Sequence, residues 1–257
     1  DGFLIPDGMS RSITSHVEAD YSPTDRLSLS VGLPFVVAKF LGPNPGPFGY
    51  PAVDECKCWQ KGWQDLSATA RYNVSSGPFG LTPSVSIGVP SHDYNYIGEA
   101  VVGRGLREIR LALDAGYRLD AVWDRLVVQG RYSYAVVERV LDIPNNRSNA
   151  QIEGAVLLSR RASVRGTVAW QRTHGGLRTG SLPPFALVIP GDVNTPERVR
   201  EHDRLLRDNY SHVGGSVAYA FPSFDVFGSY RHFAGGTDTH AGRSVTVGVS
   251  WPFEWHR

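Results

Sequence analysis

The sequence is poor in the features of helical membrane proteins, disulfide-rich proteins and nucleic-acid-binding proteins. It has no apolar run of about eighteen residues, which excludes a transmembrane helix. Its two cysteines are too few for a disulfide framework or a four-cysteine zinc site. The net charge of +1 provides no basic excess for nucleic acid. A mean hydropathy of -0.22 still permits a membrane barrel, because a polar lumen and polar loops dilute its apolar outer face.

The sequence is instead rich in residues that alternate between apolar and polar. Around position 110, Ile109 and Leu111 alternate with Glu108, Arg110 and, further on, Asp114. Successive side chains of a strand point to opposite faces, so a period of two predicts strands with one apolar and one polar face.

Alternating segments of this kind recur along the whole chain, and each has about the 9–11 residues that a tilted strand needs to cross a bilayer. They span residues 12–21, 27–37, 64–74, 83–90, 106–119, 126–137, 150–159, 163–173, 210–221, 225–233 and 244–253. The fold class that this pattern predicts is all-β: one antiparallel up-and-down transmembrane β-barrel over residues 1–257.

The connections between these segments alternate in length. Tight turns such as "SPTD" and "SRRAS" are followed by long loops over residues 38–62, 91–105, 138–149, 174–209 and 234–243. Outer-membrane barrels have short periplasmic turns and long extracellular loops, so the long loops are predicted to be extracellular. Such barrels also have even strand numbers, whereas eleven segments are visible. We therefore expect about twelve strands, with the first lying ahead of Asp1.

The two faces of the segments predict which side meets lipid. Aromatic residues such as Tyr21, Tyr117 and Trp251 cluster at segment ends, as expected of girdles at the two membrane interfaces. The residues on the polar face of the segments include charges of both signs. Charged side chains enclosed inside a barrel need either water or an opposite charge beside them. The apolar face is therefore predicted to meet lipid, and the polar face to line the lumen.

Several stretches resemble a family of proteobacterial outer-membrane proteins. The matching words are "YSPTDRLSLSVGLPFV", "QDLSATARYNV", "PSHDYNYIGEAVVGRGLRE", "RYSYAVVERVLDIPNNRSN" and "WQRTHGG". They resemble barrel proteins related to the transporters associated with the MetA pathway of phenol degradation. The resemblance covers most of the chain from about residue 12 to 176. It implies a channel of about twelve strands for small, often aromatic or apolar molecules, and it brings no catalytic residues.

The inward charges are the first candidates for function. They are Asp65, Arg71, Glu108, Arg110, Asp114, Arg118, Arg131, Glu153, Arg165 and Arg231. Opposed charges in a lumen set a transverse field that orders water and selects solutes. The alternative is a structural ladder of salt bridges that fills a narrow lumen, and the two interpretations are compatible.

A second candidate site is the long segment after residue 90. It is predicted to fold into the mouth of the barrel and constrict it, because its Ala-Val-Val run at 100–102 is too apolar for an exposed loop. The residues that would form the constriction are His92, Asp93, Tyr94, Glu99 and Arg104. The alternative is a solvated surface loop.

Two further features lie in the long loops. The charged run "PERVREHDRLLRD" has helical spacing and is either a short helix that caps the barrel or a solvated excursion. Cys56 and Cys58 are one residue apart, and the oxidising cell surface favours a disulfide over a soft-metal site.

The leading functional interpretation is a channel in the bacterial outer membrane for passive uptake of small molecules. Its expected partners are outer-membrane lipid and a small solute, without cofactor, metal or nucleic acid. A scaffolding barrel around a partner protein and an outer-membrane hydrolase are the alternatives. No serine, histidine and acid recur in a recognisable hydrolase motif, so we predict that the protein is not an enzyme.

Overall fold

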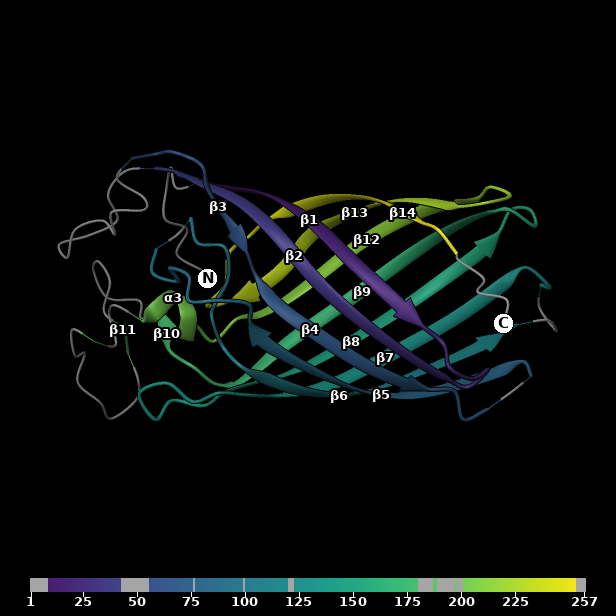
Figure 1. The fold of residues 1–257 in the computed structure, drawn as a ribbon, viewed down its shortest axis with the longest axis horizontal. Helices are drawn as coiled ribbons and strands as arrows, with labels where there is room; N and C mark the ends of the chain where they lie inside the picture. Colours follow the sequence, from purple (N-terminus) through teal and green to yellow (C-terminus); the bar gives the residue numbers. More distant parts are fainter. Residues whose placement is uncertain are drawn as a thin grey trace.

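The computed structural model describes residues 9–42, 56–75, 77–98, 100–119, 123–179, 187–188, 197 and 201–252. These residues form an almost entirely β structure of tilted strands that curl side by side (Figure 1). The strands are β1 (Met9–Tyr21), β2 (Leu27–Leu41), β3 (Gln60–Trp63), β4 (Asp65–Tyr72), β5 (Phe79–Pro90), β6 (Glu108–Arg118), β7 (Leu126–Val137), β8 (Asn145–Leu157), β9 (Ala162–Gly175), β10 (Arg178–Thr179), β11 (Leu187–Val188), β12 (Asn209–Ala220), β13 (Asp225–Thr237) and β14 (Arg243–Ser250).

The sheet has the up-and-down topology that the alternation predicts. Within the described residues its order is β1-β2-β4-β5-β6-β7-β8-β9-β12-β13-β14, and every neighbouring pair is antiparallel. The predicted fold class is confirmed. An antiparallel path with an odd number of strands leaves β1 and β14 parallel to each other, so a strand antiparallel to both would complete the ring. The strand expected ahead of Asp1 stays a prediction that the described residues do not test.

The short strand β3 was not predicted, and it adds no crossing to the barrel. It pairs with the same strand, β2, as β4 does, and only Gln64 separates β3 from β4. The interruption lies opposite Pro34, which has no N–H for the ladder, while its carbonyl accepts a hydrogen bond from Gln64 N at 2.9 Å. β3 and β4 are therefore one crossing with a bulge, and the orientation of every later turn is unchanged.

Some strands extend further toward the long loops than their apolar patterns predict. β8 begins at Asn145 rather than at residue 150, and β13 continues to Thr237 rather than ending at 233. Polar side chains support the extension of β8, because Asn146 Oδ1 accepts a hydrogen bond from Val137 N at 3.0 Å. Ladders that continue beyond the membrane need no apolar face, so hydrophobic alternation does not reveal them.

The apolar side chains are mainly on the outside of the barrel. Ile13, Leu111 and Val217 are more than half exposed, at 62%, 61% and 57%. Small buried clusters lie instead near the long-loop end, among them Val36, Ala38 and Val102. An apolar outer wall of this kind is stable in lipid and unfavourable in water.

The end of the barrel opposite the tight turns carries α3 (His202–Leu205), β10 and β11 (Figure 1). Leu205 and Leu206 are buried, and Leu205 packs with Leu177 and Ile143. The short helix α3 and these buried leucines fall within the run for which the sequence left open a capping helix or a solvated excursion.

Among the described residues, no helix has both the length and the apolar content required to cross a membrane.

Candidate functional site: a charged lumen with an inward-folded loop

The inner face carries ion pairs midway along the strands. Arg131 Nη1 on β7 donates to Asp114 Oδ2 on β6 at 2.9 Å, and the two residues are direct neighbours in the sheet. Glu153 on β8 accepts from Arg165 Nη1 on β9 at 3.2 Å and also from Gln129 on β7. The side chains of Asp114 and Arg131 are both 36% exposed, so this part of the inner face remains accessible to water.

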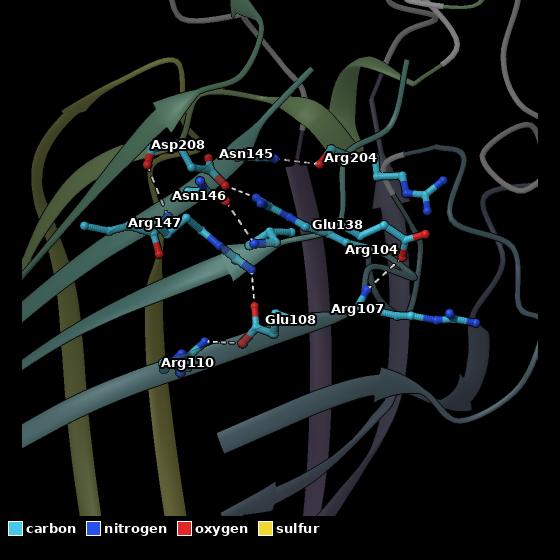
Figure 2. Close-up of polar contacts among 12 residues, drawn as sticks. Arg104, Arg107, Glu108, Arg110, Glu138, Asn145, Asn146, Arg147, Arg204 and Asp208 are labelled. Carbon is cyan, nitrogen blue, oxygen red and sulfur yellow. Dashed lines mark hydrogen bonds and ion pairs between the residues drawn. The ribbon is translucent and has the colours of Figure 1, made fainter. Parts of the chain in front are cut away.

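A second group of charges lies nearer the long loops, and we name Glu108, Arg110 and Arg147 the mouth cluster. Glu108 on β6 accepts a hydrogen bond from Arg110 Nη2 at 2.6 Å and another from Arg147 on β8 (Figure 2). Strand β7 lies between β6 and β8, and its Ala135 is the register partner of both arginines. Ala135 is fully buried beneath the cluster. Its small side chain allows Arg147 to reach across β7.

Further contacts join the loop before β6 to the segment before β12. Arg104 forms an ion pair with Asp208 (Figure 2). Arg204 Nη2 donates to the carbonyl of Gly105 at 2.9 Å. The Arg204 guanidinium also lies 4.0 Å from the ring centre of Tyr96, within the range of a cation–π interaction. The two loops are therefore fastened to each other over the mouth.

Loop 91–105 folds inward and is held there by polar and apolar contacts. Tyr94 Oη donates to the Asp65 carboxylate and accepts from Gly105 N at 2.8 Å. Ala100 is fully buried, and Val102 packs against Val36 and Ala38 on the inner face of β2. Burial and the neighbouring Asp65 carboxylate raise the pKa of Tyr94, so its hydroxyl remains a donor at neutral pH.

A cleft of about 490 Å³ opens beside this loop. It is lined by Val89, Pro90, His92, Asp93, Tyr94, Tyr96, Gly105 and Arg107. His92 and Asp93 are exposed, whereas Tyr94 and Tyr96 are half-buried. Glu99, the remaining predicted constriction residue apart from Arg104, lies outside the described residues.

The predicted lumen charges do not all meet. Asp65 joins the loop through Tyr94, and Arg71 on β4 contacts Ser30 at 3.0 Å and Asp20 at 3.6 Å. Arg118 lies exposed at the turn end of β6, and Arg231 lies exposed on β13 opposite Ser244 of β14. The predicted set is therefore spread over both ends of the barrel rather than gathered in one ring.

The sequence did not indicate four residues of the site: Ala135, Arg147, Arg204 and Asp208. Arg147 was assigned to a loop, although continuing the alternation back from Glu153 places it on the same inward parity. Arg204 lies in the four-residue helix α3 and Asp208 in the irregular segment after it, and no periodic signal predicts which neighbour each will meet.

The remaining predicted features lie on the outside or in loops. Cys56 and Cys58 are joined by a disulfide bond. His92 Nδ1 lies 2.9 Å from Ser91 Oγ, and His174 Nε2 lies 2.7 Å from Ser148 Oγ. Within the described chain, no group of three or more His, Cys, Asp or Glu side chains is arranged to hold a metal ion.

Comparison with known proteins relates this architecture to outer-membrane barrels. No family model matches the sequence, and no curated protein matches it. An outer membrane channel from Pseudomonas putida F1 aligns with 94% of this chain and 82% of its own, at 13% identity and a TM-score of 0.63. OmpT, an outer membrane protein of Vibrio cholerae, aligns over 95% of each chain at 7% identity, with a TM-score of 0.43.

The first of these similarities establishes the fold. The chain has the architecture of a Gram-negative outer-membrane β-barrel, and its apolar outer wall suits that environment. The outer-membrane location predicted from the sequence is also that of the Pseudomonas putida channel.

Proposed function

We propose that this barrel is a passive outer-membrane channel with a narrow, charge-lined lumen. The observation that carries the proposal is the solvent exposure of the central ion pair: the side chains of Asp114 and Arg131 contact each other, yet each is about a third exposed. A ladder that sealed the lumen would bury its members, because water would then be excluded from both partners. Fixed, hydrated charges are suited to selecting small polar or polarisable solutes.

We propose that the solutes are small aromatic molecules. The cleft beside loop 91–105 combines the rings of Tyr94, Tyr96 and His92 with the apolar side chains of Val89 and Pro90. Aromatic rings favour offset or edge-to-face contact with one another, so this lining would retain an aromatic solute at the entrance. The resemblance of the sequence to transporters associated with phenol degradation supports the same solute class.

Substituted cysteines distinguish an open lumen from a sealed one. Thr167 and Val168 are consecutive on β9, with Thr167 on the inward parity of Arg165 and Val168 on the outward parity. In planar bilayers, a charged thiol reagent should reduce the current through Thr167→Cys and leave Val168→Cys unchanged. The native cysteines form a disulfide and do not compete for the reagent.

The result against the proposal is equally specific. Two results together would reject the channel: the wild-type barrel conducts no ions, and the thiol of Thr167→Cys does not react. The remaining interpretation would then be a sealed scaffold. Liposome swelling should then be tested with phenol and with a sugar of similar size. Faster entry of phenol supports the aromatic solute class, and equal rates reject that class while keeping the channel.

The hydrolase alternative has two serine–histidine contacts among the described residues: the adjacent Ser91 and His92 in loop 91–105, and the pair of Ser148 and His174. Ser148 and His174 lie on the outward faces of β8 and β9, away from the lumen. A catalytic pair of this kind also needs a third group to orient the histidine. We therefore do not propose an enzyme, and ester hydrolysis abolished by His174→Ala would reverse that conclusion.

A further inference from the structure

The outward face of β1, β2 and β3 carries a group of cations at its long-loop end. Arg11 on β1 is the register partner of Lys39 on β2, and Lys61 on β3 is the partner of Val37, two residues before Lys39. Direct partners in a sheet point to the same side, and residues two apart in one strand share that side. The three cations therefore form one outward patch, which we name the rim patch.

No acidic residue shares the plane of the rim patch within the described strands β1 to β4. Over the described parts of β1 to β4, the carboxylates of Glu18, Asp20 and Asp65 all fall on the inward parity. Three neighbouring cations without a carboxylate among them repel one another, so an external anion would stabilise the arrangement. A third lysine, Lys57, is exposed between the two disulfide-bonded cysteines and lies close in sequence to the patch.

The surroundings of the rim patch locate it relative to the membrane. Lys39 Nζ lies 5.9 Å from the ring centre of Trp59, and Trp63 packs edge-on against Phe35 at 5.1 Å. Tryptophan is enriched where the hydrocarbon core meets the headgroups. Toward the middle of the barrel the outward positions become apolar, with Ile13 and Val17 more than 60% exposed. The cations therefore lie at headgroup level on the side of the long loops.

We infer that Arg11, Lys39 and Lys61 bind the phosphate groups of lipopolysaccharide, the phosphorylated glycolipid of the outer leaflet. Lysine and arginine at the surface attract anionic headgroups, and an ammonium suits a phosphate as a compact point charge. The site concerns the outer wall of the barrel and is independent of what passes through the lumen.

Lipid binding to the full chain in phosphatidylethanolamine nanodiscs tests this inference. The probe is bisphosphorylated lipid A, and native mass spectrometry measures its binding. Removing each cation should weaken binding about fivefold, so Arg11→Gln, Lys39→Gln and Lys61→Gln together should weaken it on the order of a hundredfold. Lipid A without phosphate groups should bind wild type as weakly as this triple variant binds the phosphorylated form.

A matched control removes three cations from the opposite end. Arg26, Arg160 and Arg161 are exposed in tight turns, and their replacement by glutamine should leave lipid A binding unchanged. The variant Lys39→Arg with Lys61→Arg keeps the charge and should keep binding, which separates loss of the site from loss of the fold.

Three outcomes would overturn the inference. The first is wild-type affinity in the triple glutamine variant, and the second is equal binding of dephosphorylated lipid A. The third is an equal loss in the turn-side control, which would show a response to net charge alone. Inorganic phosphate at the same concentration should not displace the lipid; displacement would make free phosphate the ligand.

Discussion

Arg147 on β8 reaches across strand β7 and donates a hydrogen bond to Glu108 on β6, and the buried Ala135 lies beneath this contact. The same carboxylate also accepts from Arg110. One acid therefore pairs with two guanidinium groups on the inner wall near the mouth, and the three side chains together keep a net charge of +1. This relationship makes the charge balance of the lumen sensitive to a single residue.

Glu108→Gln should make the channel more selective for anions. The change leaves Arg110 and Arg147 without their shared carboxylate, so a positive field remains near the mouth. The reversal potential in a potassium chloride gradient should shift toward the chloride potential. Glu138→Gln is the control, because Glu138 is exposed at the rim and outside the lumen. An equal shift in both variants would contradict a role for the mouth cluster.

Ala135→Leu should destabilise the barrel by about 1–3 kcal/mol, because added methyl groups in a fully buried position force neighbouring side chains to move. It should also break the contact between Arg147 and Glu108. Urea unfolding in detergent micelles measures the stability change. Ala68→Leu adds the same groups at an exposed outward position of β4, where little or no loss is expected. Similar losses in the two variants would show that the ion pair plays no special part.

Leu113→Arg should cost about 2–4 kcal/mol, the range for arginine on the lipid face at the bilayer midplane. Leu113 lies at the centre of β6 on the outward parity and is 46% exposed. Thr82→Arg places the same side chain inward, next to Asp114, and should cost less. Equilibrium unfolding in lipid vesicles compares the two. A larger cost for the inward arginine would reverse the assignment of faces.

Tyr94→Phe should loosen the loop over the mouth. The change removes the hydroxyl that donates to Asp65 and accepts from Gly105 N. Loss of a hydrogen bond that leaves a buried partner unsatisfied costs about 1–3 kcal/mol. Hydrogen exchange should accelerate in residues 94–105, and open-channel noise should increase. Tyr132→Phe, at an exposed outward tyrosine, should change neither.

Tyr94 should also make loop 91–105 sensitive to alkaline pH. Burial and the neighbouring Asp65 raise its pKa above the ordinary value of about 10, so the folded state holds the proton more tightly than the unfolded state. The hydroxyl of Tyr94 stabilises the loop fully below about pH 10, and this stabilisation is lost as the pH rises through the raised pKa of the folded state. Open-channel noise should therefore increase over that window in wild type. Tyr94→Phe should show no such step.

Much of the fold could be predicted from the sequence because the barrel repeats one local rule. Alternation at positions such as Glu108, Ile109 and Arg110 fixes which face is polar, and the turn and loop lengths fix the order of neighbours. The bulge opposite Pro34 interrupts the hydrogen-bond ladder of one strand pair, and it changes neither the order of the strands nor the orientation of the later turns.

The candidate site was harder to predict because its contacts join residues far apart in the chain. Arg104 meets Asp208 across 104 positions, and Arg204 meets Gly105 across 99. No periodicity relates the loop before β6 to the segment that contains α3, so neither contact has a signal in the sequence. The inward loop was predictable only through its apolar run, which could not be left in water.

The sequence by itself determined the number of visible crossings, their up-and-down order and the side that faces lipid, because each follows from the local alternation of side chains along a strand. Only the tertiary structure decided which charges meet. That choice depends on the stagger between neighbouring strands and on a small residue, Ala135, that lets one arginine reach past an intervening strand.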